Sequence, residues 1–82
     1  MKNAIIITGC EGEIGFAISK FFIEKNYFVI GIDKKKSCKS KSINKIHTDL
    51  TKILKSKSNF NYFKKELKKL LIGKKLICLI NN

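Results

Sequence analysis

Apolar residues follow two kinds of pattern along the 82-residue chain. Runs of neighbouring apolar residues predict strands at Ala4–Ile7, Tyr27–Ile32 and Leu76–Ile80, with a shorter strand at Lys45–Thr48. The strand at Ala4–Ile7 is expected to be covered on both faces, and the one at Leu76–Ile80 to form an open apolar edge. Apolar residues at three- and four-residue spacing predict two amphipathic helices, one from near Ile14 to about Asn26 and one over Asn59–Leu71. Strands that alternate with helices in this way predict an α/β protein built on a parallel sheet.

Each predicted helix has an apolar stripe that should face the sheet. In the first helix the stripe consists of Ile14, Ala17, Ile18, Phe21 and Phe22. In the second helix it consists of Phe60, Phe63, Leu67, Leu70 and Leu71, with lysines mostly opposite. Asn26 and Gly73 are suited to the left-handed residue that ends a helix. The polar segment from Lys34 to Asn44 predicts a solvated connection with room for a short irregular helix.

Three glycines stand between the first strand and the first helix, in the sequence Thr8-Gly9-Cys10-Glu11-Gly12-Glu13-Ile14-Gly15. The first N–H groups of a helix have no partner within the helix and carry the positive end of its dipole. A glycine turn lets a diphosphate approach these groups, so this segment predicts a dinucleotide site. A glycine turn with a purely steric role is the alternative.

Asp33 closes the second predicted strand, 18 residues after Gly15. An acidic side chain at this distance can accept hydrogen bonds from the adenosine ribose hydroxyls, and its charge repels a 2′-phosphate. The sequence therefore predicts a preference for NAD over NADP. Lys34, Lys35 and Lys36 follow directly and would weaken that preference. An aspartate that only shapes the turn is the alternative.

The net charge of +12 suggests a nucleic-acid or anionic-membrane partner, but every one of the 18 basic residues is Lys. Because Arg is the residue that binds bases and phosphates in a bidentate manner, we interpret the lysines as solvated surface and expect no nucleic-acid or membrane partner. No apolar segment reaches the ~20 residues of a membrane span. Cys10, Cys38 and Cys78 lack metal-ligand spacing, and no signal peptide precedes the first strand. Free thiols in a cytoplasmic protein without a metal site are therefore expected.

These landmarks together resemble the N-terminal part of the short-chain dehydrogenase/reductase family. The glycine segment resembles its nucleotide turn, Asp33 its ribose-binding acid, and Asp49-Leu50 the pair that meets the adenine. Asn81-Asn82 resembles the opening of its Asn-Asn-Ala-Gly motif. The resemblance implies cofactor contacts from Thr8, Gly9, Gly12, Ile14, Gly15, Asp33, Asp49, Leu50, Asn81 and Asn82.

The spacing of the glycines differs from that of the common oxidoreductase branch, whose middle glycine stands where this chain has Glu13. Gly12 instead matches the longer branch of nucleotide-sugar epimerases and dehydratases, which does not usually have Asn-Asn after the fourth strand. We therefore favour the oxidoreductase branch and keep the longer branch as the alternative. A charge at Glu13 is compatible with a diphosphate only if the side chain points to solvent.

The family's catalytic Ser, Tyr and Lys follow the Asn-Asn-Ala-Gly motif, so none is assigned here. Tyr62 and Lys65 are one residue too close for its Tyr-x-x-x-Lys motif. The resemblance implies that residues 1–82 form a partial NAD(P)-binding Rossmann domain, in the strand order 3-2-1-4, cut after the fourth strand. Its homo-oligomeric parent would transfer hydride between the nicotinamide and an alcohol or carbonyl of a small molecule. A non-catalytic NAD-binding regulatory module is a further alternative.

Overall fold

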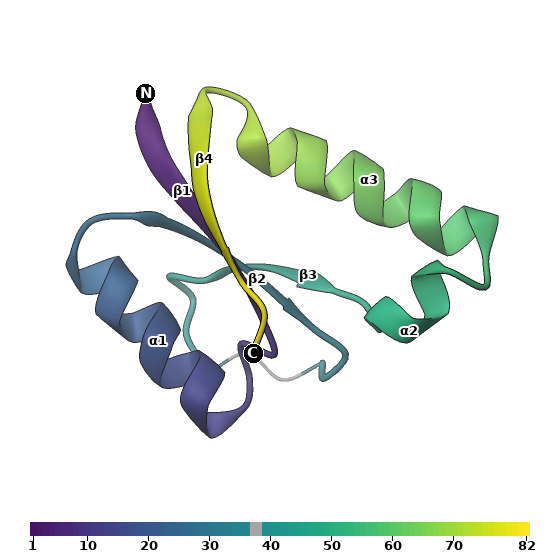
Figure 1. Cartoon of the computed structure of the whole chain (residues 1–82), viewed down its shortest axis with the longest axis horizontal. Coiled ribbons are helices and arrows are strands. Elements are labelled where there is room, and N and C mark those ends of the chain that lie inside the picture. Colours follow the sequence, from purple (N-terminus) through teal and green to yellow (C-terminus); the bar gives the residue numbers. More distant parts are fainter. Residues whose placement is uncertain (37–38) are drawn as a thin grey trace.

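The chain adopts an α/β fold in a computed structural model that describes residues 1–36 and 39–82 (Figure 1). Ser37 and Cys38 lie outside the described residues, so the predicted thiol at Cys38 is not addressed. The strands are β1 (Lys2–Thr8), β2 (Phe28–Asp33), β3 (Asn44–His47) and β4 (Lys74–Ile80). The helices are α1 (Glu13–Glu24), α2 (Leu50–Ile53) and α3 (Lys57–Leu71).

The strands form one parallel sheet in the order β3-β2-β1-β4, which confirms the order predicted from the sequence. Ile6 of β1 lies opposite Ile30 of β2 and Leu79 of β4. The strand order reverses beside β1, because the chain proceeds outward to β3 on one side and then returns to add β4 on the other. The carboxyl ends of β1 and β4 therefore meet at the point where open parallel sheets bind ligands.

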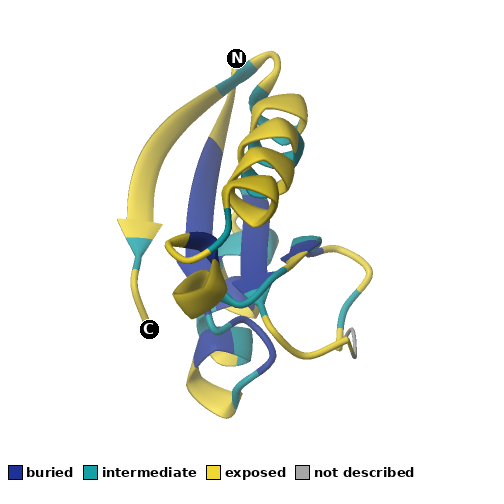
Figure 2. Ribbon diagram, turned by 90° about the vertical axis from the view of Figure 1, so that its right-hand side faces the viewer, coloured by how far each residue is buried: buried dark blue, intermediate teal, exposed yellow. Residues whose placement is uncertain are grey.

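The core has two layers, one on each face of the sheet. On the face that packs against α1, the buried cluster contains Ile5, Ile7 and Val29. On the face that packs against α3, it contains Ile6, Ile30, Ile32 and Ile46. Burial of each such side chain stabilises the fold by about 1.5–3 kcal/mol. In Figure 2 the central strands are correspondingly dark blue.

The apolar stripe predicted for α1 is wrong at three of its five positions. Ile14, Ala17 and Phe21 are exposed, whereas Ile18 and Phe22 contact the core as predicted. The buried centre of the contact face consists of Gly15 and Ser19, and the Ser19 hydroxyl donates to the Gly15 carbonyl at 2.8 Å. Small side chains occupy the closest approach to the sheet, so a pattern based on hydrophobicity alone places the face incorrectly.

Helix α3 follows its predicted stripe at Phe63, Leu67, Leu70 and Leu71, which pack against the sheet. Phe60 was predicted as core, but its side chain is 46% exposed. The first turn of α3 lies beside α2, at the end of the helix away from β4, where the sheet does not cover it (Figure 1). Within the described residues, no helix is long and apolar enough to cross a membrane.

The loops and helix ends are mostly as predicted. Asn26 after α1 and Gly73 after α3 both have left-handed backbone, with φ of 66° and 71°. The described part of the connection between β2 and β3 contains turns and bends and no helix. The short helix α2 was not predicted, because its single buried residue, Ile53, cannot produce a periodic pattern.

Strand β4 lies at one edge of the sheet, and most of its residues are exposed. Leu76, Ile77 and Leu79 are all more than two-fifths exposed, and β4 is largely yellow in Figure 2. An apolar edge strand with unpaired backbone groups is a site of further strand pairing or of aggregation.

Candidate functional site

The turn between β1 and α1 is compact and depends on glycine. Gly9 has a φ of +68°, a conformation that residues with a Cβ rarely adopt. Its N–H donates to the Ile32 carbonyl at 2.7 Å, and its own carbonyl accepts from Gly12 N–H at 3.1 Å. A Cβ on Gly15 would lie 2.0 Å from the Gly9 carbonyl oxygen, so only glycine allows α1 to begin this close to β1.

Helix α1 begins without a side-chain cap. Its N-cap is Gly12, and no described side chain accepts from the amides of the first turn there. Three of these amides lack partners within the helix, which leaves them for water or for an anion. Glu13 is exposed. A diphosphate was expected to tolerate the charge of Glu13 only if this side chain points to solvent, and its exposure is consistent with that.

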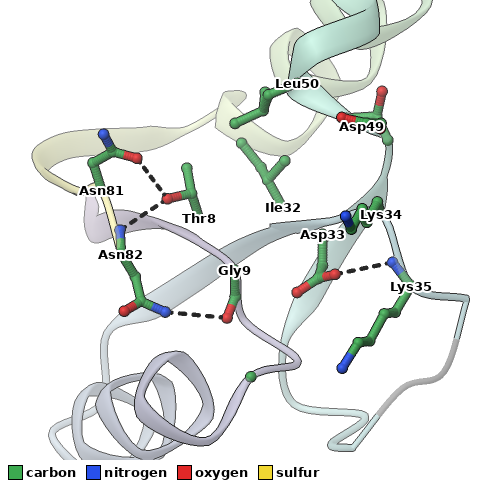
Figure 3. A pocket seen from close by; sticks show the side chains of 12 residues that line it. Thr8, Gly9, Ile32, Asp33, Lys34, Lys35, Asp49, Leu50, Asn81 and Asn82 are labelled. Atoms are coloured by element: carbon green, nitrogen blue, oxygen red, sulfur yellow. Dashed lines mark hydrogen bonds between the residues drawn. The ribbon is translucent and has the colours of Figure 1, made fainter.

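Thr8 connects the ends of β1 and β4. Its hydroxyl donates to Asn81 Oδ1 at 2.9 Å and accepts from the Asn82 N–H at 3.0 Å. The Asn82 side-chain amide reaches the Gly9 carbonyl at 3.4 Å. Figure 3 shows Thr8 between the two asparagines and Gly9 below them. The two asparagines therefore fix one wall of the glycine turn.

Asp33 forms the opposite wall, at the carboxyl end of β2. Its Oδ2 accepts from the Glu11 N–H and its Oδ1 from the Lys35 N–H, both at 2.9 Å. Burial alone would raise the pKa of this carboxyl group, but the two N–H donors and the charges of Lys45 and Lys35 hold the pKa below its usual value. Asp33 is therefore an ionised, oriented acceptor.

Asp49 is the N-cap of α2. Its Oδ1 accepts from the Thr51 hydroxyl at 2.7 Å and from the Thr51 N–H at 3.0 Å. These two bonds lower the pKa of Asp49, so this side chain also carries a charge. Leu50, the next residue, has a partly exposed apolar side chain suited to contact with a flat ring.

An open pocket of about 390 Å³ joins these features. Eight of the ten predicted site residues line the pocket: Thr8, Gly9, Gly12, Asp33, Asp49, Leu50, Asn81 and Asn82. Gly15 does not line it, because it lies buried against Gly9, and Ile14 does not line it either. The pocket also includes four residues outside the predicted set: Ile32, Lys34, Lys35 and Thr48. Ile32 directly precedes Asp33, and Thr48 directly precedes Asp49. This position next to predicted site residues could have identified both as pocket residues.

Comparison with known proteins identifies the type of fold. No protein-family profile and no curated protein matches the chain. Among solved structures, the chain is similar to 4-hydroxyisoleucine dehydrogenase complexed with NADH, with a TM-score of 0.59 and 27% sequence identity. The chain has a Rossmann-type fold. The alignment covers 84% of this chain and 29% of that dehydrogenase, so the chain spans less than a third of its length.

Other chemistry-bearing side chains of the described residues include His47, Cys10 and Cys78. Among the described residues, no group of three or more His, Cys, Asp or Glu side chains could hold a metal ion. His47 is the last residue of β3, and its Nε2 lies 2.8 Å from the Lys34 carbonyl oxygen. Cys10 and Cys78 are free thiols, as predicted.

We expect Cys10 to resist alkylation. Burial and the negative charges of Glu11 and Asp33 raise the pKa of its thiol to about 11, while Cys78 is exposed on β4. The thiolate is the nucleophile, so at about pH 8 iodoacetamide should modify Cys10 at least ~100-fold more slowly than Cys78. Peptide mass spectrometry after short labelling pulses measures both rates. In urea the two rates should converge, and equal rates in the folded chain would contradict the buried placement of Cys10.

Proposed function

We propose that the chain binds a nicotinamide dinucleotide, with a preference for NAD over NADP. The observation that carries the proposal is the pocket itself, which places the uncapped start of α1 and the ionised Asp33 on the same cavity. Amides at a helix start are suited to a diphosphate, and an oriented carboxylate is suited to ribose hydroxyls. The similarity to a dehydrogenase complexed with NADH supports the same ligand.

The rest of the pocket fits the remainder of such a ligand. Leu50 and Ile32 offer apolar surface for the adenine, and Asp49 lies beside them. Asn81 and Asn82 line the pocket on the β4 side of the turn. These groups offer one contact each for the adenine, the ribose and the diphosphate of a dinucleotide.

The wider role that we propose is that of the cofactor-binding part of an NAD-dependent oxidoreductase of the short-chain dehydrogenase/reductase type. The sequence landmarks of that family coincide with pocket residues, and the similar dehydrogenase extends well beyond the matched region. In such a parent the cofactor supplies hydride chemistry, while this chain's residues bind and orient it. The small-molecule substrate and the catalytic Ser, Tyr and Lys would belong to the rest of the parent.

Titration of the ¹⁵N-labelled chain with NADH tests the binding proposal. We expect the amide signals of Gly9, Gly12 and Gly15 to shift together with those of Asp33 and Asn82, and we expect NADPH to bind at least about tenfold more weakly. The shifts should persist at about 0.3 M KCl, where exposed charges are screened. Shifts confined to surface lysines, or lost with salt, would instead indicate non-specific binding of an anion to the basic surface.

A further inference from the structure

Glu11 is the most buried charged side chain of the glycine turn. Its side chain is 1% exposed, although it stands between Gly9 and Gly12, which both line the open pocket. Its Oε2 lies 3.1 Å from Nζ of Lys45 on β3, whose side chain is 9% exposed. Within the described residues, this oxygen has no hydrogen bond of good geometry, so the contact is chiefly a pairing of charges. Its Oε1 accepts from the Lys39 N–H at 3.0 Å.

The pair belongs to a closed ring of contacts around Asp33. The Glu11 N–H donates to Asp33 Oδ2, and the Glu11 carboxylate pairs with Lys45. The Lys45 ammonium in turn donates to the Lys35 carbonyl, and the Lys35 N–H donates to Asp33 Oδ1. Each oxygen of Asp33 is therefore held by a backbone N–H, and the Glu11–Lys45 pair joins the two residues that provide those groups.

Net stability alone does not account for such a pair. Removing two charges from water costs several kcal/mol, and apolar replacements of similar size are often as stable or more stable. A buried pair is better suited to holding two segments in one geometry. Here the pair joins the glycine turn to the Lys35 carbonyl through Lys45 and to the Lys39 N–H through Glu11.

We propose that Glu11 and Lys45 are positioning residues for the ribose end of the nucleotide site. The pair sets the direction in which Asp33 presents its free lone pairs, and so determines the discrimination between a ribose 2′-hydroxyl and a 2′-phosphate. The proposal rests on the proposed function for the identity of the ligand. The placement of Asp33 that it predicts is a property of the ligand-free chain.

The first test needs no nucleotide. Amide hydrogen exchange in the ligand-free chain is measured for the wild type, Glu11→Gln, Lys45→Met and Lys45→Arg. We expect Glu11→Gln and Lys45→Met to increase exchange at residue 11 and Lys35 by at least about tenfold, with smaller changes in β1 and β2. Lys45→Arg keeps the charge and should restore wild-type exchange. Lys41→Met, an exposed lysine in the same connection, is the matched control.

The second test measures NADH and NADPH affinity for the same variants by fluorescence. Glu11→Gln and Lys45→Met should weaken NADH binding about tenfold without weakening NADPH binding, whereas Lys45→Arg and Lys41→Met should retain the wild-type ratio. Equal losses for both nucleotides, or a uniform rise in exchange across the sheet, would overturn the positioning role. If wild type bound no NADH while exchange changed selectively, the proposed function would fail and the positioning of Asp33 would stand.

Discussion

The Gly15→Ala variant is expected to lose most of its folded population and, with it, nucleotide binding. The added Cβ would lie 2.0 Å from the Gly9 carbonyl oxygen and 2.8 Å from the Asn82 side-chain nitrogen. The first of these atoms belongs to backbone that the bonds from Gly9 to Ile32 and from Gly12 to Gly9 hold in place, so the clash cannot be relieved by a side-chain rotation. We expect the free energy of unfolding in urea to fall by about 3 kcal/mol, a large share for a domain of this size.

Gly12→Ala is the matched control, because it adds the same methyl group three residues earlier. Its Cβ would lie 3.5 Å from the Gly9 carbonyl oxygen, an ordinary contact, and the φ of −76° suits alanine. Loss of a favourable N-cap residue should cost about 1 kcal/mol. This variant should therefore fold, yet bind NADH at least about tenfold more weakly, because the methyl group occupies the approach to the helix amides. Wild-type stability in Gly15→Ala, or wild-type affinity in Gly12→Ala, would contradict the geometry of the turn.

The sequence predicted most of the residues that line this pocket, because each of them depends on local chemistry. A strand end places Asp33 and Asn81 at the same edge of the sheet, since all the strands are parallel. The left-handed backbone of Gly9 and the close contact of Gly15 explain why glycine is needed at those positions. Local sequence is sufficient for such features, because backbone geometry imposes them within a few residues.

What the sequence did not predict depends on tertiary contacts. The face of α1 is determined by how closely Gly15 and Ser19 approach the sheet, and hydrophobicity carries no signal for that distance. The burial of Glu11 depends on Lys45, 34 residues away. A single acidic residue in a glycine turn gives no indication of such a distant partner. Phe60 fits the helical period but extends past the area that the sheet covers.

Asp33→Asn should have the largest effect on cofactor preference. The variant keeps the size of the side chain but removes the charge that accepts ribose hydroxyls and repels a 2′-phosphate. Hydrogen bonds to charged groups contribute about 1.5–3 kcal/mol, so NADH affinity should fall by about 50-fold. NADPH affinity should rise, because Lys34 and Lys35 line the same pocket and would no longer be offset by the carboxylate. Fluorescence titration with both nucleotides measures the ratio.

Asp49→Asn removes a charge from the same pocket and is the control for that ratio. Asp49 uses its carboxylate to cap α2 through Thr51, so its replacement should change the affinities for NADH and NADPH by similar factors. An equal change in preference for the two variants would mean that net charge in the pocket, and not the placement of Asp33, selects the cofactor.

The dependence of stability on pH provides a separate test of the ionised state of Asp33. Its folded pKa lies below the usual value of 3.8, so the carboxylate stabilises the fold fully above that value and loses this contribution as pH falls through the folded pKa. The stability difference between wild type and Asp33→Asn should therefore shrink below about pH 4 in urea unfolding measurements. Asp49 also titrates in that window, but it is present in both proteins, so its contribution cancels in the difference. A difference that stayed constant down to about pH 2.5 would mean that the N–H groups of Glu11 and Lys35 do not hold the carboxylate in its charged form.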